Sequence, residues 1–418
     1  MKNSKPKKQR IVNDKTLIVA IDIGKMSNTG YYRYPDGTEG RAFVFPNTHQ
    51  GFEQLWATIC RAKASGHMER VIVGFEPTGS YGEPLVHFLS SRGLILVQVN
   101  PMHIKRLKEL QGNSPNKTDQ KDPKVIADVV ALGRVLTVVI PRGDAAELRR
   151  LTQARERTLK RRTALLNQLQ EVVFLCFPEF LQIMGDVKTK SARYLLRHYC
   201  LPEDVVGRGT DALAKELRRV SRGKWGMARA KLLVEAAQQS VGIREGRGAM
   251  VMEISHLLST IEGCEAFVAQ LEKELRQTLR LIPYSQFILP MKGIGQITVA
   301  GLIGEVGDFR HFNSIPEVLK HAGLDLYELS SGNHKGQRHI SKRGRPLMRK
   351  LLFFAAMRAA RSGGIMYAHY QRYLANGMKK VVALVAVARK LLCIIFALVR
   401  DQSTYQADFQ RTQHKKAA

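Results

Sequence analysis

Four acidic residues stand out in this basic sequence because two of them lie within or at the end of apolar segments. Asp22 lies inside VAIDIG and Glu76 closes RVIVGFE, whereas Asp119 and Asp122 follow together in KTDQKD. Carboxylate oxygens are hard ligands that suit Mg²⁺, and a pair of such ions can stabilise both the attacking and the leaving oxygen of a phosphoryl transfer. These four acids are therefore predicted to ligate Mg²⁺, with two ions in each site.

Each of these acids also has an ordinary structural explanation. An Asp at the end of a strand is commonly a turn residue, and Asp119 fits a solvated loop. Asp122 precedes Pro123, which is typical of a helix N-cap followed by proline at the first helical position. The DIGK segment at Asp22 is also similar to the phosphate loop of actin-like and sugar-kinase ATPases, although a second phosphate loop and an adenosine motif are not evident.

The segments around the acids predict an α/β domain over residues 16–142, after a basic, disordered arm at 1–15. Apolar runs bounded by turn residues predict strands, and apolar residues at helical spacing predict helices. Their order places one acid on the first strand, one at the end of the fourth strand, and a pair at the start of the last helix, which is the ribonuclease-H-like arrangement. The predicted strands are 17–24, 30–34, 42–45, 70–75 and 94–99, and the predicted helices are 52–64, 85–91, 101–110 and 122–136.

The rest of the chain is predicted to be mainly helical. Residues 145–173 and 254–281 are rich in Leu, Gln, Arg and Glu at helical spacing, which predicts an antiparallel coiled-coil arm. Between them, the basic and Gly-punctuated residues 184–245 are predicted to be a helical insertion. The predicted divisions are 143–283 for the arm with its insertion, 284–405 for a C-terminal unit and 406–418 for a polar tail.

A glycine-containing segment, ILPMKGIGQITVA at 288–300, predicts a binding site for nucleic-acid phosphate. Its glycines allow a tight turn between two helices, and the N–H groups at the start of the second helix would point at a phosphate. This pattern is typical of a helix-hairpin-helix, which binds the DNA backbone without reading base sequence. A plain turn between two helices also fits, because Gly-x-Gly is a weak signal. The residues predicted to contact phosphate are Lys292, Gly293 and Gly295.

A second basic segment, 331–350, begins at a pair of serines, Ser330 and Ser331. It holds seven Lys and Arg and two His without an acidic residue. A serine among guanidinium groups is placed to meet a phosphodiester whose charge they neutralise, but serine is a weak nucleophile until a base or a metal activates it. The serine therefore fits a nucleophile, a phosphate anchor or a residue of a solvated loop. The predicted nucleic-acid contacts here are Lys335, Arg338, Lys342, Arg343, Arg345 and Arg349.

The composition limits the class of protein. The chain has 418 residues, with 66 Lys and Arg against 36 Asp and Glu, and a formal net charge of +30. This charge predicts a polyanionic partner, most often nucleic acid, and a hydrophobic content of 44% excludes wholesale disorder. Five widely spaced cysteines without a C-x-x-C pair argue against zinc ribbons and a disulfide framework, and they suit a reducing cytoplasm.

Membrane insertion is not predicted. The Lys-rich N-terminus has no apolar region of the kind found in signal peptides. The apolar segment 381–399 carries Arg389 and Lys390 at its centre, where charge is costly in lipid. This segment is therefore predicted to be a buried or amphipathic helix.

The ordered series of motifs resembles the DEDD-type insertion-sequence transposases related to the Piv site-specific invertase. The resemblance covers residues 16–135 and 284–400, and it leaves 184–245 without a recognisable motif. The motifs that carry it are AIDIGK, GFEPTGSYG, VNPMHIKRLKE and KTDQKDP in the first half, and MKGIGQITVAGLIGEVGDFRHF, HAGL, SSG, HISKRGRPLMRKLLFFAA and KKVVALVAVARKLL in the second.

This resemblance implies a RuvC-like N-terminal domain, a coiled-coil arm and a mainly helical C-terminal transposase domain. It implies that Asp22, Glu76, Asp119 and Asp122 bind Mg²⁺ and that Ser331 attacks DNA to form a covalent phosphoserine, with the adjoining Ser330 leaving an ambiguity of one residue. Many members of the family have Asp-Ala where this chain has Asp122-Pro123, a departure that favours the N-cap explanation at that position.

The resemblance also implies partners. Members of the family work with a structured noncoding bridge RNA whose loops pair separately with target and donor DNA, and they assemble as tetramers in which each active site combines domains of different protomers. The predicted function is therefore an RNA-guided DNA recombinase acting on double-stranded donor and target DNA in a prokaryotic cytoplasm. Two alternatives stay open, a metal-dependent Holliday-junction or structure-specific nuclease and a non-enzymatic RNA-binding scaffold.

Overall fold

The computed structural model describes residues 12–76, 79–111, 121–328, 336 and 338–406. The chain divides into two compact units, which are described separately. The first combines the chain up to Pro141 with Val306–Ser362 and Met366–Asp401, and nearly all of the second is Arg142–Glu305. Residues 1–11 of the predicted disordered arm lie outside the described residues, but its last residues are ordered by a turn at Asn13 and an ion pair of Lys15 with Glu69, which corrects its boundary. Of the predicted polar tail only residue 406 is described.

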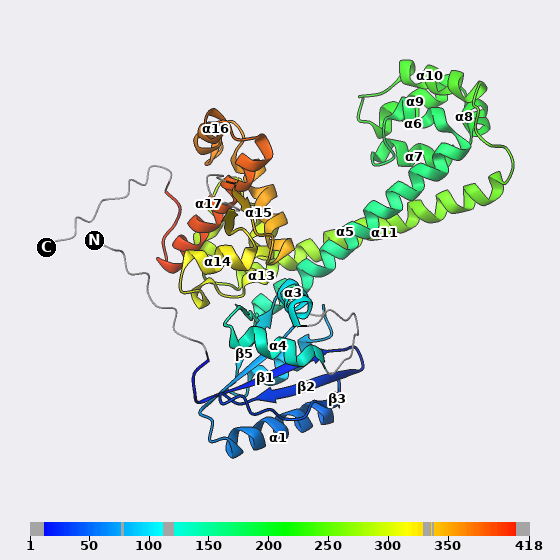
Figure 1. Cartoon of the computed structure of the whole chain (residues 1–418). Coiled ribbons are helices and arrows are strands. Elements are labelled where there is room, and N and C mark those ends of the chain that lie inside the picture. Colours follow the sequence, from blue (N-terminus) through cyan, green and yellow to red (C-terminus); the bar gives the residue numbers. More distant parts are fainter. Residues whose placement is uncertain (1–11, 77–78, 112–120, 329–335, 337, 407–418) are drawn as a thin grey trace. The chain divides into compact units, whose positions relative to one another are not determined.

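The first unit begins with a six-stranded mixed sheet of order β3-β2-β1-β4-β5-β6 (Figure 1). β1 pairs in parallel with β4 and antiparallel with β2, and β4 pairs in parallel with β5. The two central strands read as continuous apolar runs because the sheet is covered on both faces. The strands are β1 (Thr16–Ile23), β2 (Ser27–Arg33), β3 (Phe43–Pro46), β4 (Arg70–Phe75), β5 (Ile95–Val99) and β6 (Val135–Thr137).

Two hydrophobic clusters lie on opposite faces of this sheet. Leu17, Val19 and Ile21 of β1 pack with residues of α1 and α2, whereas Ile18 and Ala20 pack with residues of α3 and α4. This division follows from the alternation of side chains along a strand. The covering helices are α1 (His49–Ser65), α2 (Glu83–Ser90), α3 (Pro101–Gln111) and α4 (Lys121–Ala131).

Gly74 of β4 lies where α4 approaches the sheet most closely. A Cβ atom at this position would lie 2.4 Å from Cγ2 of Val130 on α4, far inside van der Waals contact. The glycine therefore sets the distance between the sheet and the helix that begins beside the acidic residues.

Replacing Gly74 with Ala is expected to lower the free energy of unfolding by about 1–3 kcal/mol through overpacking. In a Val130→Ala background the added methyl group fills space that the smaller side chain has vacated, so the loss caused by Gly74→Ala becomes smaller. Urea unfolding followed by Trp56 fluorescence in a Trp225→Phe background measures this coupling. An equal loss in both backgrounds would contradict the close contact.

One predicted helix was too long. Residues 122–136 were expected to be helical throughout, but α4 ends at Ala131 and Val135–Thr137 forms β6, which pairs antiparallel with β5. The physical reason is Gly133, whose φ of 66° ends the helix in the left-handed region that glycine adopts easily. The next apolar residues then extend the sheet instead of the helix.

The second unit is built on two long helices, α5 (Asp144–Cys176) and α11 (Arg247–Arg280), which lie side by side (Figure 1). Arg155 donates to Glu272 at 2.9 Å and Gln168 donates to Glu253 at 2.8 Å, so the two helices run antiparallel. The prediction of two long helices over 145–173 and 254–281 is confirmed. The coiled-coil packing of these helices stays a prediction. The insertion at one end is α6 (Pro178–Met184), α7 (Lys190–His198), α8 (Pro202–Arg208), α9 (Thr210–Val220) and α10 (Met227–Gln238).

The C-terminal part of the first unit is mainly helical. Its apolar helix α17 is the one helix among the described residues that is long and apolar enough to cross a membrane. It packs against α14, α15 and α16, and Arg389 on it donates to the carbonyl of Leu324 at 2.7 Å, as expected for a core helix that holds a charge. The elements are α14 (Ile315–Ala322), β7 (Leu326–Glu328), β8 (Arg338–Ile340), α15 (Pro346–Ala359), α16 (Tyr367–Ala375) and α17 (Lys380–Arg400), after a short helix at Phe309–His311.

Candidate catalytic site

Two of the predicted acids are neighbours at the carboxyl ends of the parallel strands β1 and β4. The register pairs Ile21 with Phe75, so the residues that follow, Asp22 and Glu76, come next to each other across the ladder. The same alternation that turns Ala20 and Gly74 toward α4 turns both acids to that face. Both side chains are half-buried.

The third acid, Asp122, joins them from α4. Burial raises the pKa of the Glu76 carboxyl, the negative charges of Asp22 and Asp122 raise it further, and the Lys108 ammonium opposes these effects. Lys108 on α3 also forms an ion pair with Asp122. The three acids are therefore close enough to repel one another, and Lys108 neutralises part of this charge.

The structure corrects one detail at Asp122. α4 begins at Lys121, so Asp122 lies in the first turn of the helix and is not its N-cap. Asp119 lies outside the described residues. Among the residues that the structure does describe, no group of three or more His, Cys, Asp or Glu side chains forms a set able to hold a metal ion. Asp22 and Asp122 thus lie close enough to Glu76 for their charges to act on it. The described residues alone do not form a complete set of metal ligands.

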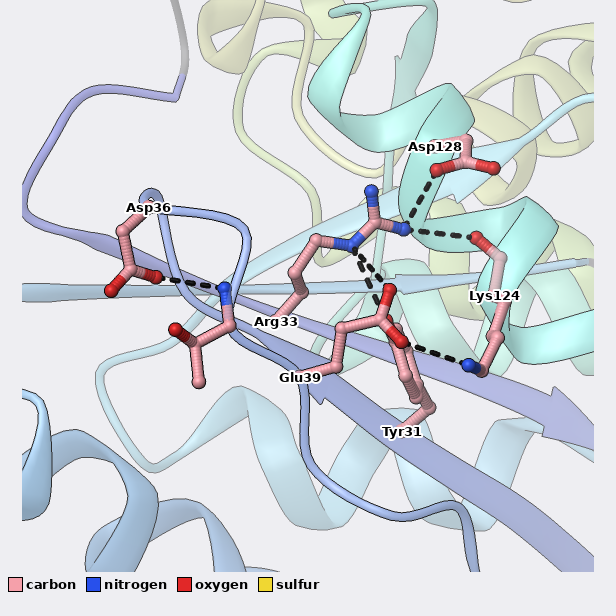
Figure 2. A network of polar contacts seen from close by, with 7 residues as sticks. Tyr31, Arg33, Asp36, Glu39, Lys124 and Asp128 are labelled. Atoms are coloured by element: carbon pink, nitrogen blue, oxygen red, sulfur yellow. Dashed lines mark hydrogen bonds and ion pairs between the residues drawn. The ribbon is translucent and has the colours of Figure 1, made fainter.

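A polar network holds α4 against the end of β2 (Figure 2). Arg33 donates to Asp128 at 2.7 Å and to the carbonyl of Lys124 at 3.4 Å. Glu39 completes the network with an ion pair to Lys124 at 2.8 Å, and the Lys124 ammonium also lies over the ring of Tyr31. Burial raises the pKa of Tyr31 to about 12, so its hydroxyl stays neutral and accepts from Arg33.

Replacing Arg33 with Met is expected to destabilise the first unit by about 1–3 kcal/mol, because it removes a half-buried, charge-assisted hydrogen bond. Arg33→Lys keeps the charge but lacks the planar guanidinium group that donates to both Asp128 and the carbonyl of Lys124. It should therefore be more stable than Arg33→Met but less stable than the parent. Hydrogen exchange of α4 amides measures the effect, with Arg61→Met on the exposed face of α1 as the control. Unchanged exchange in α4 would show that the network does not hold the helix.

Sequence reasoning did not assign roles to Arg33 and Lys108. Lys108 lies within the motif VNPMHIKRLKE, so the signal was present, but its partner Asp122 is distant in the sequence. Arg33 occupies the end of a strand, where a polar residue needs no special explanation. Both roles depend on contacts between elements that are separated along the chain.

The basic segment after the serine pair is partly regular structure, which corrects the expectation of a loop from 331 to 350. Its described part contains β8, paired with β7, and the first residues of α15. Gly344 lies against the backbone of Gly323, where a Cβ would be 2.4 Å from the Gly323 nitrogen, so the two segments are in direct backbone contact. Ser330, Ser331 and Lys335 lie outside the described residues.

The predicted phosphate contacts of this segment differ in their surroundings. Lys342 and Arg343 are exposed, and Lys342 has a φ of 54°, in the left-handed region. Arg338 is exposed on β8 and forms an ion pair with Glu328 at 2.9 Å. Arg349 donates to the carbonyls of Ala322 and Gly344 at 3.0 and 3.1 Å, and burial lowers its pKa. Arg349 therefore joins α15 and the segment before it to the end of α14, and it is less available to a ligand than its neighbours, including the half-buried Arg345.

The glycine segment forms a turn before a helix. The single-turn helix α12 (Ser285–Ile288) precedes it and α13 (Gln296–Val306) follows it. Gly293 has a φ of 95°, which glycine adopts without strain, and Lys292 beside it is exposed. Gly295 directly precedes α13. Because α12 is only four residues long, the helix-hairpin-helix remains a prediction.

Comparison with known families matches both halves of the chain. A model of DEDD-type transposases of IS110 elements, described as a transposase, matches residues 19–178, which include Asp22, Glu76, Asp119 and Asp122. A second model, described as a transposase of the IS116/IS110/IS902 family, matches residues 285–371. Together the two matches span more than half of the chain and agree with the α/β sheet and the helical remainder. The chain is an insertion-sequence transposase.

Two similar curated proteins span 94% and 74% of the chain. A 43.6 kDa protein of insertion element IS110 from Streptomyces coelicolor is 22% identical over 94% of this chain and 96% of its own length. The transposase of insertion sequence element IS1111A from Coxiella burnetii is 24% identical over 74% of this chain and 72% of its own length. The chain belongs to the IS110/IS116 family of DEDD transposases.

Proposed function

We propose that this transposase joins donor and target DNA by Mg²⁺-dependent strand exchange, guided by a structured RNA and passing through a covalent phosphoserine. The observation that carries the proposal is the juxtaposition of Asp22 and Glu76 on adjacent parallel strands, with Asp122 close enough to affect the pKa of Glu76. Carboxylates gathered in this way are stabilised by a cation.

The chemistry of the donor set fits a divalent metal. The negative charges of Asp22 and Asp122 raise the pKa of Glu76, and a bound cation would remove this repulsion. Asp22, Glu76, Asp119 and Asp122 would hold Mg²⁺, which when bound neutralises the charge of the reacting phosphodiester. Lys108 supplies one positive charge at Asp122 and would orient that carboxylate.

The second half of the proposed site is the basic segment that follows the serine pair. Ser331 would attack the phosphodiester, and exposed cations such as Lys342 and Arg343 would neutralise the phosphate that it approaches. Lys292, Gly293 and Gly295 would bind backbone phosphate away from the reacting bond. The carboxylates and the serine of one site would come from different protomers of a tetramer, as the family resemblance implies.

The guide RNA is tested by purifying the full chain from cells that carry its element and sequencing the nucleic acid that accompanies it. A discrete structured RNA encoded by the element is expected. Removing it with ribonuclease should abolish recombination between donor and target plasmids, and adding it back should restore recombination. Recombination that continues without RNA would overturn the guidance, and cleaved but unjoined DNA would favour a structure-specific nuclease.

A further inference from the structure

The helical insertion α6–α10 forms a folded body with its own core. Side chains of α9 and α10, such as Leu213, Leu217 and Leu233, are fully buried together with apolar residues of α5 and α11. Figure 1 shows the five helices gathered at one end of the α5–α11 pair. Neither family match extends over α7–α10, so the role of this body has to be sought in its own surface.

Cations of this body fall into two groups. One group is neutralised within the second unit: Arg193 pairs with Glu265 at 3.0 Å, Arg197 with Glu262 at 2.8 Å, and Arg208 with Glu216. These pairs join the insertion to α11 or its own helices to one another. They are structural contacts that leave little charge for a ligand.

The other group lies around the turn between α9 and α10. None of its members forms a salt bridge within the described part of the chain, and all are exposed except the half-buried Arg229. Glu216 is the one acidic residue in this stretch, and it is turned away to accept from Tyr199 and Arg208, both at 2.9 Å. We name this group the basic turn surface, and it consists of Lys215, Arg218, Arg222, Lys224, Arg229 and Lys231.

The turn between α9 and α10 is closed by hydrogen bonds. The N–H of Gly223 donates to the carbonyl of Arg218 at 2.8 Å, and the N–H of Arg222 donates to the carbonyl of Arg219, which together form a Schellman motif at the end of α9. The N–H of Trp225 then donates to the hydroxyl of Ser221 at 2.8 Å. These bonds define the backbone positions from which Arg222 and Lys224 extend.

Arg222 occupies the position in this motif that glycine usually takes. Its φ is 56°, in the left-handed region where a residue with a Cβ is strained. Glycine would adopt this backbone conformation more easily, so the turn itself does not require an arginine here. We therefore assign a role to the side chain of Arg222. That side chain is exposed.

We propose that the basic turn surface binds the phosphate backbone of double-stranded DNA during transposition. Exposed cations that form no salt bridge among the described residues, and that follow one another along α9, the turn and α10, suit the phosphates of a duplex. Trp225, the aromatic residue of the turn, is half-buried and has Lys224 and Arg229 within 5.8 and 5.0 Å of its ring, so it is poorly placed to stack on an unpaired base. Single-stranded nucleic acid and RNA loops are usually bound by such stacking, and the surface therefore favours duplex DNA.

The proposal rests on the transposase identity of the chain and on neither the metal nor the guide RNA. Its test is therefore a binding measurement with the full chain in EDTA, using fluorescence anisotropy of a labelled 40-base-pair DNA duplex over a range of NaCl concentrations. The test variant is Arg222→Gln, Lys224→Gln, Lys231→Gln. The control removes three exposed cations of the second unit that form no salt bridge among the described residues: Lys190→Gln, Arg244→Gln, Lys273→Gln.

The two variants carry the same net charge, so they separate a local surface from general electrostatic attraction. The test variant is expected to lower affinity by roughly tenfold or more and to reduce the slope of log K against log salt by about 3, near one for each lost phosphate contact. The control should change the slope by less than about 1. Equal effects of the two variants would overturn the proposal.

Arg222→Gly separates binding from folding. Because glycine relieves the left-handed strain, this variant should unfold at the same temperature as the parent or a higher one, yet it should bind duplex DNA more weakly, with a slope reduced by about 1. Unchanged binding would overturn the role of Arg222. A structured RNA hairpin provides the second ligand, and a loss of affinity for the hairpin alone would assign the surface to RNA and overturn the proposal for DNA.

Discussion

Replacing Glu76 with Gln is expected to reduce DNA cleavage and joining by roughly 10²–10³-fold or more, while DNA binding stays within about twofold. Glutamine keeps the shape of the side chain but removes the charge that Mg²⁺ requires, and the neighbouring Asp22 and Asp122 then lack part of the ligand set. The measurement compares cleaved and joined products formed by the full chain with Mg²⁺, guide RNA and both DNA substrates.

Asp22→Asn should behave like Glu76→Gln, and the double variant should lose little more than either single variant, because residues that act as one unit are not additive. The control is Asp36→Asn, which removes an exposed acid from a turn between β2 and β3. Normal turnover in Glu76→Gln would show that the acids at this edge of the sheet are structural. Equal losses of activity and of DNA binding would instead point to a folding defect.

The N-terminal sheet was predictable because its strands are strongly apolar and its acids interrupt them at defined places. A run such as RVIVGF is typical of a central strand, and the carboxyl ends of neighbouring parallel strands meet at one edge. The sequence therefore indicated that Asp22 and Glu76 would be close. The register of Ile21 against Phe75 bears this out.

Features that depend on distant contacts were not predictable. Residues 135–137 were assigned to a helix because apolar spacing alone does not show that Gly133 ends it or that β5 offers a free edge. The network at Arg33 joins residues about 95 positions apart. A short polar contact of this kind leaves no periodic pattern in one sequence. The same holds for Lys108, whose ion pair with Asp122 exists only after α3 and α4 have packed.

Local geometry accounts for the remaining differences. The basic segment at 331–350 reads as a loop because it is rich in glycine and charge, yet β8 and the contact of Gly344 with Gly323 give its described part a defined path. Arg222 and Lys342 carry positive φ angles that composition does not reveal. Both residues are cations in left-handed positions, and in both cases the backbone conformation fixes where the charge is presented.

The Ser331→Ala variant is expected to lose the covalent protein–DNA adduct completely and to reduce joining by at least about 10³-fold. In the proposed reaction the Ser331 oxygen attacks phosphorus and displaces a deoxyribose oxygen, so the energy of the broken bond is kept in the phosphoserine until a new DNA end attacks it. Alanine removes the nucleophile without adding charge or bulk. Electrophoresis of end-labelled DNA under denaturing conditions detects the adduct as a shifted, protease-sensitive band.

Ser330→Ala is the matched control, because it removes the same hydroxyl group one position away within the same basic surroundings. Retention of the adduct in Ser330→Ala and its loss in Ser331→Ala would support the assignment, and the reverse result would move the nucleophile by one residue. If the active parent forms no adduct, the reaction does not pass through a phosphoserine intermediate. Water would then be the attacking group, and DNA cleavage should persist in both serine variants but still be lost in Glu76→Gln. The experiments therefore test the role of the carboxylates and the role of the serine separately.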